Sequence, residues 1–159
     1  MSLLMAWSIF ERQWILAGTV FVLAVTTDLL DGYAARKLNA TSPFGGLLDH
    51  SADAVFVIIT IGSFAWINET SMLLPMLTAL AFAQYAIDSN VHHGQSLIAS
   101  RLGRYNGIGY FLFAGALVLS EVLNPNHRYW SLFIRSAEIM LVMTTTLSMA
   151  DRLRRSLMT

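Results

Sequence analysis

Five apolar stretches dominate this sequence, and each is close to the length of a helix that crosses a membrane. A transmembrane helix needs about 20 mostly apolar residues to cover the hydrocarbon of a bilayer. The stretches cover residues 14–34, 47–67, 72–87, 105–122 and 129–149. Short connections join them, so neighbouring helices should run antiparallel. We therefore expect an all-α integral membrane protein, a bundle of about five transmembrane helices in one domain that covers residues 1–159.

The composition supports a membrane protein and excludes several other classes. Charged residues make up 13% of the chain, whereas a typical soluble domain has about 25%. The formal net charge is zero, so the overall charge gives no reason to expect a nucleic-acid partner. The chain has no cysteine, which rules out disulfides and thiolate metal sites. Residues 1–10 lack a basic flank and a small-residue cleavage site, so we expect no cleaved signal peptide.

The basic residues predict which ends of the helices face the cytoplasm. Loops on the cytoplasmic side of a membrane carry an excess of lysine and arginine. One set of alternating loops contains Arg36, Lys37, Arg101, Arg104, Arg152, Arg154 and Arg155. The other set contains only Arg12 and Arg128. We therefore place the first set in the cytoplasm and the protein in the plasma (inner) membrane. The aspartates described next lie on that same cytoplasmic side.

Four aspartates stand at one end of the first two apolar stretches. Asp28 and Asp31 are three residues apart, and Asp49 and Asp53 are four apart, so each pair shares one face of a helix. Ionisable residues at membrane depth are costly and usually functional. Two such faces turned toward each other would form a four-carboxylate cage of oxygen ligands, which suits a hard divalent cation.

Ordinary roles at helix ends do not explain the whole pattern. Capping, solvation or pairing with Arg36 could account for one or two of the aspartates. The segment reads D-x-x-D-G-x-x-A-R-x8-G-x-x-x-D-x-x-x-D from Asp28 to Asp53. With each residue type near 6% of ordinary composition, a chance match at a given start is on the order of 10⁻¹⁰. The pattern therefore indicates a functional motif.

This motif resembles the signature of the CDP-alcohol phosphotransferase family at every fixed position. Members of that family are multispan homodimers that move a phosphatidyl group, typically from CDP-diacylglycerol, to a second alcohol and release CMP. The resemblance implies that Asp28, Asp31 and Asp49 are metal ligands. It implies that Asp53 is the general base and a further ligand. Two Mg²⁺ ions are the expected cofactor, with Mn²⁺ as an alternative, because two metal ions can clamp the attacking and leaving oxygens of a phosphate.

The rest of the motif suggests a site for the CDP group of the donor. Gly32 and Ala35 are small and would leave room for a nucleotide against the helix, and Arg36 can form paired hydrogen bonds with a phosphate. Gly45 completes the motif. Family members often have a hydroxyl residue at the place of Ser42, although Thr41 beside it could take that role. Residues 41–43 can also be read simply as a turn and the start of a helix.

Arg101 and Arg104 lie in a loop on the same predicted side as the aspartates. One interpretation is that they bind a phosphorylated acceptor, with glycerol 3-phosphate as the leading candidate. Serine, inositol phosphate and other polyols remain open. The other interpretation is that both arginines only reflect the positive charge of cytoplasmic loops.

The sequence departs from the family pattern in two places. Only residues 1–13 precede the first apolar stretch, too few to cross about 30 Å of hydrocarbon as a helix. Family members usually have six spans, so we expect the first family helix to be absent or the sequence to begin late. In addition, phosphatidylglycerophosphate synthases often have Pro-Leu-Ala-Asp-Lys where this chain has His50-Ser-Ala-Asp53-Ala, which weakens assignment to that subgroup.

Two other functions are compatible with the same residues. Carboxylates in a helical bundle also suit a cation transporter or a metal-binding membrane protein, although such a path needs polar groups beyond the membrane midplane. Beyond the midplane, the last three stretches supply only Arg135 and Glu138. The second alternative to a transferase is an inactive family member that acts as a partner subunit.

Overall fold

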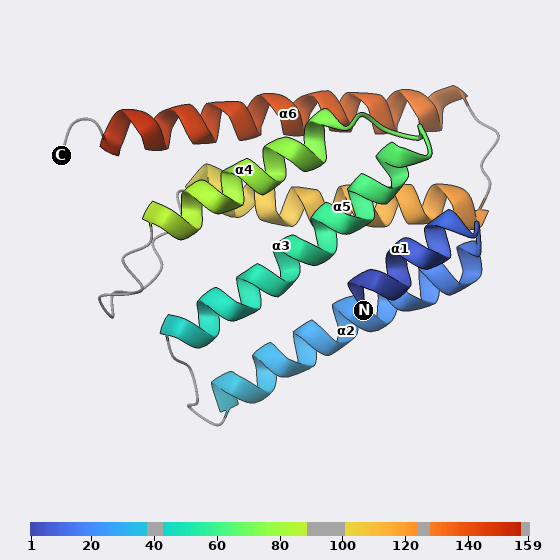
Figure 1. Cartoon of the computed structure of the whole chain (residues 1–159), viewed down its shortest axis with the longest axis horizontal. Helices are drawn as coiled ribbons and strands as arrows, with labels where there is room; N and C mark the ends of the chain where they lie inside the picture. Colours follow the sequence, from blue (N-terminus) through green and yellow to red (C-terminus); the bar gives the residue numbers. More distant parts are fainter. Residues whose placement is uncertain (38–42, 89–100, 124–127, 157–159) are drawn as a thin grey trace.

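The computed structural model describes residues 1–37, 43–88, 101–123 and 128–156, which form helices joined by short turns (Figure 1). No strand occurs in these ranges. In chain order the helices are α1 (Ser2–Phe10), α2 (Trp14–Lys37), α3 (Pro43–Trp66), α4 (Leu73–Asp88), α5 (Arg101–Leu123) and α6 (Arg128–Ser156).

Each predicted apolar stretch coincides with one helix, from α2 to α6, so the all-α bundle is confirmed. Helices α2, α3, α5 and α6 are long and apolar enough to cross a membrane. Helix α4 has 16 residues and is shorter than a full span. The largest difference in boundaries is at α6, which continues to Ser156 rather than ending at Met149. The added turns contain Leu153 and arginines, which favour helix.

Helix α1 is absent from the sequence-based expectation. Its 9 residues give a length of about 14 Å, roughly half the thickness of the hydrocarbon. Met5, Ser8 and Ile9 are buried, and α1 packs on both α2 and α3 (Figure 1). It therefore joins these two helices at the end remote from the aspartates.

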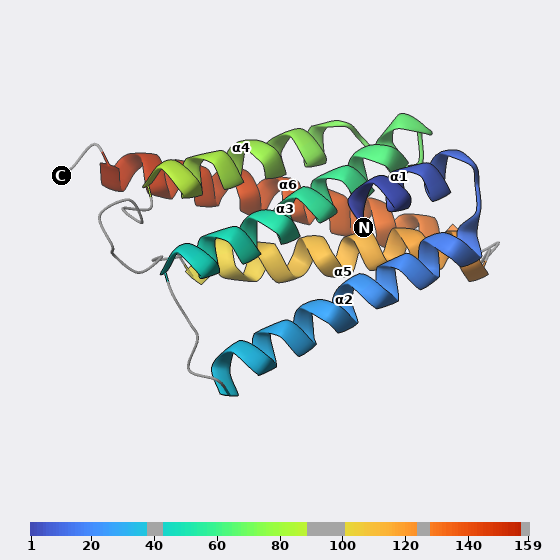
Figure 2. The same cartoon turned by 60° about the horizontal axis from the view of Figure 1, so that its bottom comes forward.

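Helices α2 and α3 are positioned mainly by their neighbours. Helix α2 packs on α1 and α5, and α3 packs on α1, α4 and α5. Extensive contact between α2 and α3 is not found in the described residues. In Figure 2 the end of α2 moves away from α5. The relative placement of the two aspartate-bearing helices therefore depends on the helices that contact both of them.

Large apolar side chains lie on the surface of the bundle as well as in its core. Phe64, Ile61 and Leu117 are fully or almost fully buried, but Ile15 is 81% exposed and Ile87 is also 81% exposed. Large exposed apolar patches are typical of surfaces that contact lipid. Threonine and serine hydroxyls on the helices donate to carbonyls one turn earlier, as in Thr26 to Val22 O at 2.7 Å. Such bonds satisfy polar groups where water is absent.

Two helices end at residues in the left-handed region. Arg12 has φ of 54° after α1, and Asn68 has φ of 66° after α3. The Gln13 N–H donates to Ser8 O at 2.8 Å, and the Glu69 N–H donates to Phe64 O at 3.0 Å. These bonds close Schellman motifs that satisfy carbonyls at the helix ends. The first motif reverses the chain and lays α1 along α2.

Two glycines on α5 allow neighbouring helices to approach closely. A Cβ on Gly109 would lie 2.7 Å from Leu141 Cδ2 of α6, and one on Gly115 would lie 3.1 Å from the Phe21 ring of α2. Gly107 differs, because a Cβ there would meet nothing within 4 Å. Gly115 is thus a position where α2 and α5 approach closely.

We predict that Gly115→Ala destabilises the bundle relative to Gly107→Ala. Overpacking typically costs about 1–3 kcal/mol, and the added methyl group at Gly115 has no free space. Thermal unfolding in detergent should give a lower midpoint for Gly115→Ala than for Gly107→Ala. Equal midpoints would show that the approach of α2 to α5 does not depend on the missing side chain.

Candidate active site

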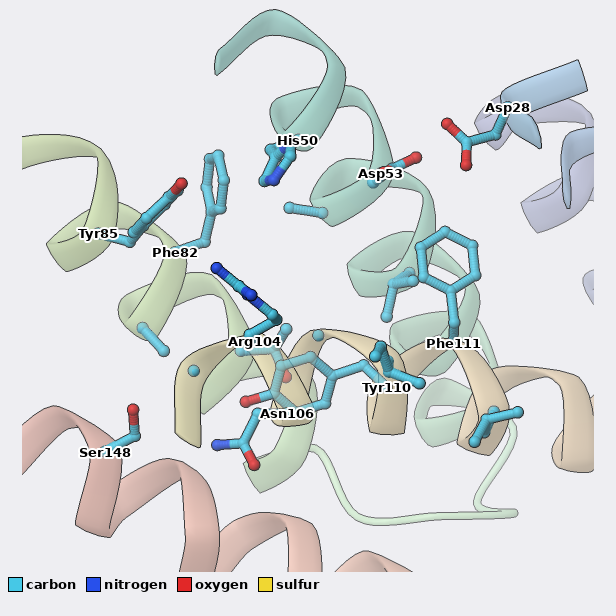
Figure 3. Close-up of a pocket in the computed structure, with 18 of the residues that line it drawn as sticks. Asp28, His50, Asp53, Phe82, Tyr85, Arg104, Asn106, Tyr110, Phe111 and Ser148 are labelled. Atoms are coloured by element: carbon cyan, nitrogen blue, oxygen red, sulfur yellow. The ribbon is translucent and has the colours of Figure 1, made fainter. Parts of the chain in front are cut away.

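A cavity of about 770 Å³ lies among α2, α3, α4, α5 and α6, next to the predicted aspartates (Figure 3). Its volume is in the range of sites for small-molecule ligands. Every one of these helices contributes polar side chains to its lining, namely Asp28, His50, Asp53, Thr78, Gln84, Tyr85, Arg104, Asn106, Tyr110, Ser148 and Arg152.

Three of the predicted aspartates meet at this cavity. Asp28 of α2 and Asp49 and Asp53 of α3 each have a carboxylate oxygen within 4.8 Å of the others. Figure 3 shows the carboxylates of Asp28 and Asp53 directed toward each other. Asp28 and Asp53 are partly buried, and Asp49 is exposed. The helical spacing of four residues puts Asp49 and Asp53 on one face of α3, and that face is turned toward α2.

Asp31 does not belong to this group. It is exposed and lies about one turn beyond Asp28 on α2, and the cluster of carboxylates within 4.8 Å of one another consists of Asp28, Asp49 and Asp53. The structure therefore brings together three carboxylates of the predicted four, and the role of Asp31 as a ligand stays a prediction.

The residues predicted to bind the CDP group are only partly described. Gly32 is half-buried in the last turns of α2, and Gly45 is exposed in the first turn of α3. Ala35 and Arg36 lie in α2, but their side chains are outside the described part of the structure, and so is the whole of Ser42. Their roles remain predictions.

Arg104 is placed at the cavity, as one of the two sequence interpretations requires. It lies in the first turn of α5 and lines the cavity, and Figure 3 shows its guanidinium directed toward His50 and Phe82. Arg101 begins α5, and its side chain is outside the described residues.

Arg152 of α6 also lines the cavity, whereas its place in the sequence indicated only a role in membrane topology. Its guanidinium lies over the ring of Tyr85, with Cζ 5.0 Å from the ring centroid. The His50 ring stacks on the same tyrosine at 6.4 Å between centroids. The sequence did contain a signal for a role of Arg152 at the site, because the basic cluster after the last span lies on the same predicted side as the aspartates.

Uncharged polar side chains form the part of the cavity between α4, α5 and α6. Asn106 is 5% exposed and Ser148 is 6% exposed. The hydroxyls of Tyr110 and Thr145 share a hydrogen bond of 2.5 Å. This polar wall was not predicted from the sequence. The sequence signal for it was helical spacing. Asn106 and Tyr110 are four residues apart and Thr145 and Ser148 are three apart, so each pair shares one face of its helix.

Apolar side chains form the opposite part of the cavity, between α2 and α5. This part is lined by Phe21, Val25, Leu29, Ile108, Phe111 and Leu112. Leu29 is 64% exposed and Leu112 is 70% exposed, so the lining continues onto the apolar outer surface of the bundle. The cavity therefore has a polar part and an apolar part, and Asp28 and Asp53 also line it.

The cluster formed by the carboxylates of Asp28, Asp49 and Asp53 suits a divalent metal ion. Like charges this close repel each other, and a bound cation would remove that repulsion. Carboxylate oxygens are the ligands that hard cations such as Mg²⁺ prefer. Asp28, Asp49 and Asp53 are therefore the residues that could hold a metal here.

Comparison with known proteins agrees with this site. The family model for CDP-alcohol phosphatidyltransferase matches residues 1–150. A CDP-diacylglycerol–glycerol-3-phosphate 3-phosphatidyltransferase from Pseudomonas fluorescens is 40% identical over 52 residues, which is 33% of this chain and 27% of that protein. A second protein of that name, number 2 from Arabidopsis thaliana, is 27% identical over 103 residues, or 55% of this chain and 44% of that one.

A cardiolipin synthase (CMP-forming) from Oryza sativa subsp. japonica is 43% identical over 53 residues, covering 32% of this chain and 16% of the relative. The chain thus spans less than half the length of each of these three relatives. No solved structure matches it. The family match covers nearly all of the described helices and includes every residue of the carboxylate group, so this chain belongs to the CDP-alcohol phosphatidyltransferase family.

Proposed function

We propose that this chain is a membrane phosphotransferase that moves a phosphatidyl group from CDP-diacylglycerol to an alcohol and releases CMP. The observation that carries the proposal is the meeting of Asp28, Asp49 and Asp53 at a cavity with one polar and one apolar part. Glycerol 3-phosphate is the proposed acceptor, since the relatives from P. fluorescens and A. thaliana are named for it.

The donor would occupy the apolar part of the cavity. Its acyl chains can remain in lipid next to Leu29 and Leu112, while its head group reaches Asp28 and Asp53. Arg36 and the small residues Gly32 and Ala35 are the predicted contacts of the CDP group, with Ser42 and Gly45. This placement is supported by the exposure of Leu29 and Leu112, which brings the cavity lining to the outer surface.

Asp53 is the proposed general base. Its carboxylate is half-buried and faces the cavity (Figure 3). It would accept the proton of the acceptor hydroxyl, and the acceptor oxygen would then attack the phosphorus that carries the diacylglycerol. The new P–O bond forms as the bond from that phosphorus to the bridging anhydride oxygen breaks. The electron pair of the broken bond leaves with CMP.

Two Mg²⁺ ions, or Mn²⁺ ions, are the proposed cofactor, held by Asp28, Asp49 and Asp53 with Asp31. When bound, they would neutralise charge on the phosphates during transfer. Asp31 lies outside the group of three carboxylates, so its role as a ligand rests on the family motif alone.

Arg104 and Arg152 are the proposed binding residues for the phosphate of the acceptor, with Arg101 beside them. Both described side chains line the cavity, and guanidinium groups suit a phosphate because they can donate paired hydrogen bonds. The polar wall of Asn106, Tyr110 and Ser148 would face the hydroxyls of the acceptor.

We also propose that the protein is a homodimer in the plasma (inner) membrane and that its active site faces the cytoplasm. The support for the orientation is the distribution of lysine and arginine in the loops. The four long apolar helices support a multi-pass membrane protein.

The first prediction for this site concerns stability with and without Mg²⁺. Saturating Mg²⁺ should raise the thermal midpoint of the wild type, since a ligand present at 100 times its Kd stabilises by about 2.7 kcal/mol. Asp28→Asn should raise the midpoint without metal, because it removes repulsion, and should reduce the gain from Mg²⁺. Glu11→Gln, at an exposed carboxylate near the end of α1, is the control and should keep the full gain. A full gain in Asp28→Asn would contradict the metal site.

The second prediction concerns Asp53. Purified protein is incubated with CDP-diacylglycerol, Mg²⁺ and glycerol 3-phosphate, and the release of CMP is measured. General-base catalysis contributes about 10²–10⁴-fold, so Asp53→Asn should lower kcat at least 100-fold. Near-normal turnover by this variant would refute the role of Asp53. If the wild type released no CMP with any alcohol but carried metal ions across vesicles, the transporter interpretation would replace the transferase.

The third prediction concerns the arginines. Hydrogen bonds to charged groups contribute about 1.5–3 kcal/mol, so Arg104→Ala and Arg152→Ala should each raise the KM for glycerol 3-phosphate by at least about tenfold. Arg154→Ala is the matched control, since this arginine is exposed on α6 and does not line the cavity. An unchanged KM in both cavity variants would leave these arginines with a topological role only.

A further inference from the structure

Tyr85 occupies an unusual position among the residues of the cavity. It lies near the end of α4 and is only 8% exposed. Nevertheless its ring contacts a charged side chain, that of Arg152 near the end of α6. Its ring contacts three other lining residues from three helices. The His50 ring of α3 is at 6.4 Å with an interplanar angle of 22°, the Phe82 ring of α4 is at 6.1 Å, and Arg152 Cζ of α6 is at 5.0 Å.

We propose that Tyr85 is a positioning residue that holds Arg152 in the cavity for the anionic group of the acceptor. This inference rests on the proposed function. Tyr85 does not need to touch the acceptor itself. It acts by restricting where the guanidinium of Arg152 can lie.

The contact suits that role because of how an arginine binds an anion. A guanidinium that lies over an aromatic ring uses its face for the contact. Its N–H groups lie in its plane and remain available for paired hydrogen bonds with a phosphate. An arginine without such support has many rotamers, and ordering it on binding costs free energy. The ring of Tyr85 restricts the guanidinium before the acceptor arrives, which should increase affinity.

The stack with His50 extends this restraint to α3. Helix α4 packs on both α3 and α6, and Tyr85 projects from it to contact a side chain of each. His50 is the residue next to Asp49 and lies three residues before Asp53. Tyr85 therefore connects the helix that carries the proposed base to the helix that carries the proposed anion-binding arginine.

The test is a double-mutant cycle in the CMP-release assay with the full chain in detergent or lipid discs. Tyr85→Leu and Tyr85→Met remove the ring, and each should raise the KM for glycerol 3-phosphate by about fivefold to thirtyfold, the range of a cation–π contact in a partly desolvated site. The kcat should change less than twofold. Tyr85→Phe keeps the ring and should restore the wild-type KM.

The cycle with Arg152 separates positioning from general packing. In an Arg152→Ala background, Tyr85→Met should cause no further rise in KM, since there is no guanidinium left to hold. Tyr129→Leu is the matched control, because Tyr129 is 83% exposed at the start of α6 and should leave KM and kcat unchanged. The methionine variant keeps a similar side-chain volume, and its thermal midpoint shows whether the bundle is intact.

The outcomes distinguish this inference from the proposed function. An unchanged KM in folded Tyr85→Met, or an equal effect of that variant with and without Arg152, would overturn the role of Tyr85 and leave the transferase intact. A wild type without CMP release would overturn the proposed function itself. A rise in KM that depends on Arg152 and is reversed by phenylalanine supports the proposal.

Discussion

The mutual repulsion of three carboxylates is the constraint on which the rest of this structure depends. Asp28, Asp49 and Asp53 lie within 4.8 Å of one another, and two of them are partly buried. Such an arrangement is unfavourable without a cation, so the surrounding helices must hold it. The bundle does this indirectly. Helices α1 and α5 contact both α2 and α3, and Asp28 of α2 and Asp53 of α3 line the same cavity.

The same arrangement explains why the cavity has two kinds of wall. Where α2 approaches α5, close contact at Gly115 and the Phe21 ring keeps the lining apolar. Where α4, α5 and α6 meet, buried side chains such as Asn106 and Ser148 supply hydroxyl and amide groups. Asp28 and Asp53 therefore line a cavity that has both an apolar and a polar part. Both kinds of wall come from residues a few positions apart on helices of the same bundle.

The helices and the carboxylates could be predicted from the sequence because each depends on local spacing. The apolar runs defined α2 to α6, and the intervals within residues 28–53 predicted which aspartates share a helix face. The position of Asp31 outside the group of three could not be predicted, since it depends on which turn of α2 lies beside Asp49 and Asp53 in the folded bundle. The stack of His50, Tyr85 and Arg152 was equally hidden, because its members lie on three helices and no spacing relates them. Short α1 was missed because nine residues give too little apolar length to signal a helix.

The exposure of Leu29 and Leu112 at the rim of the cavity affects how the occupancy of the cavity by the proposed lipid donor would depend on concentration. A ligand that enters sideways from the bilayer diffuses in two dimensions and never crosses bulk water. Its effective concentration is then its mole fraction among the surrounding lipids, and dilution with inert lipid or detergent would lower occupancy even at constant total amount. The water-soluble partner would follow ordinary bulk concentration. Occupancy of the cavity by the lipid ligand would thus depend on membrane composition, and occupancy by the water-soluble ligand would depend on its concentration in the aqueous phase.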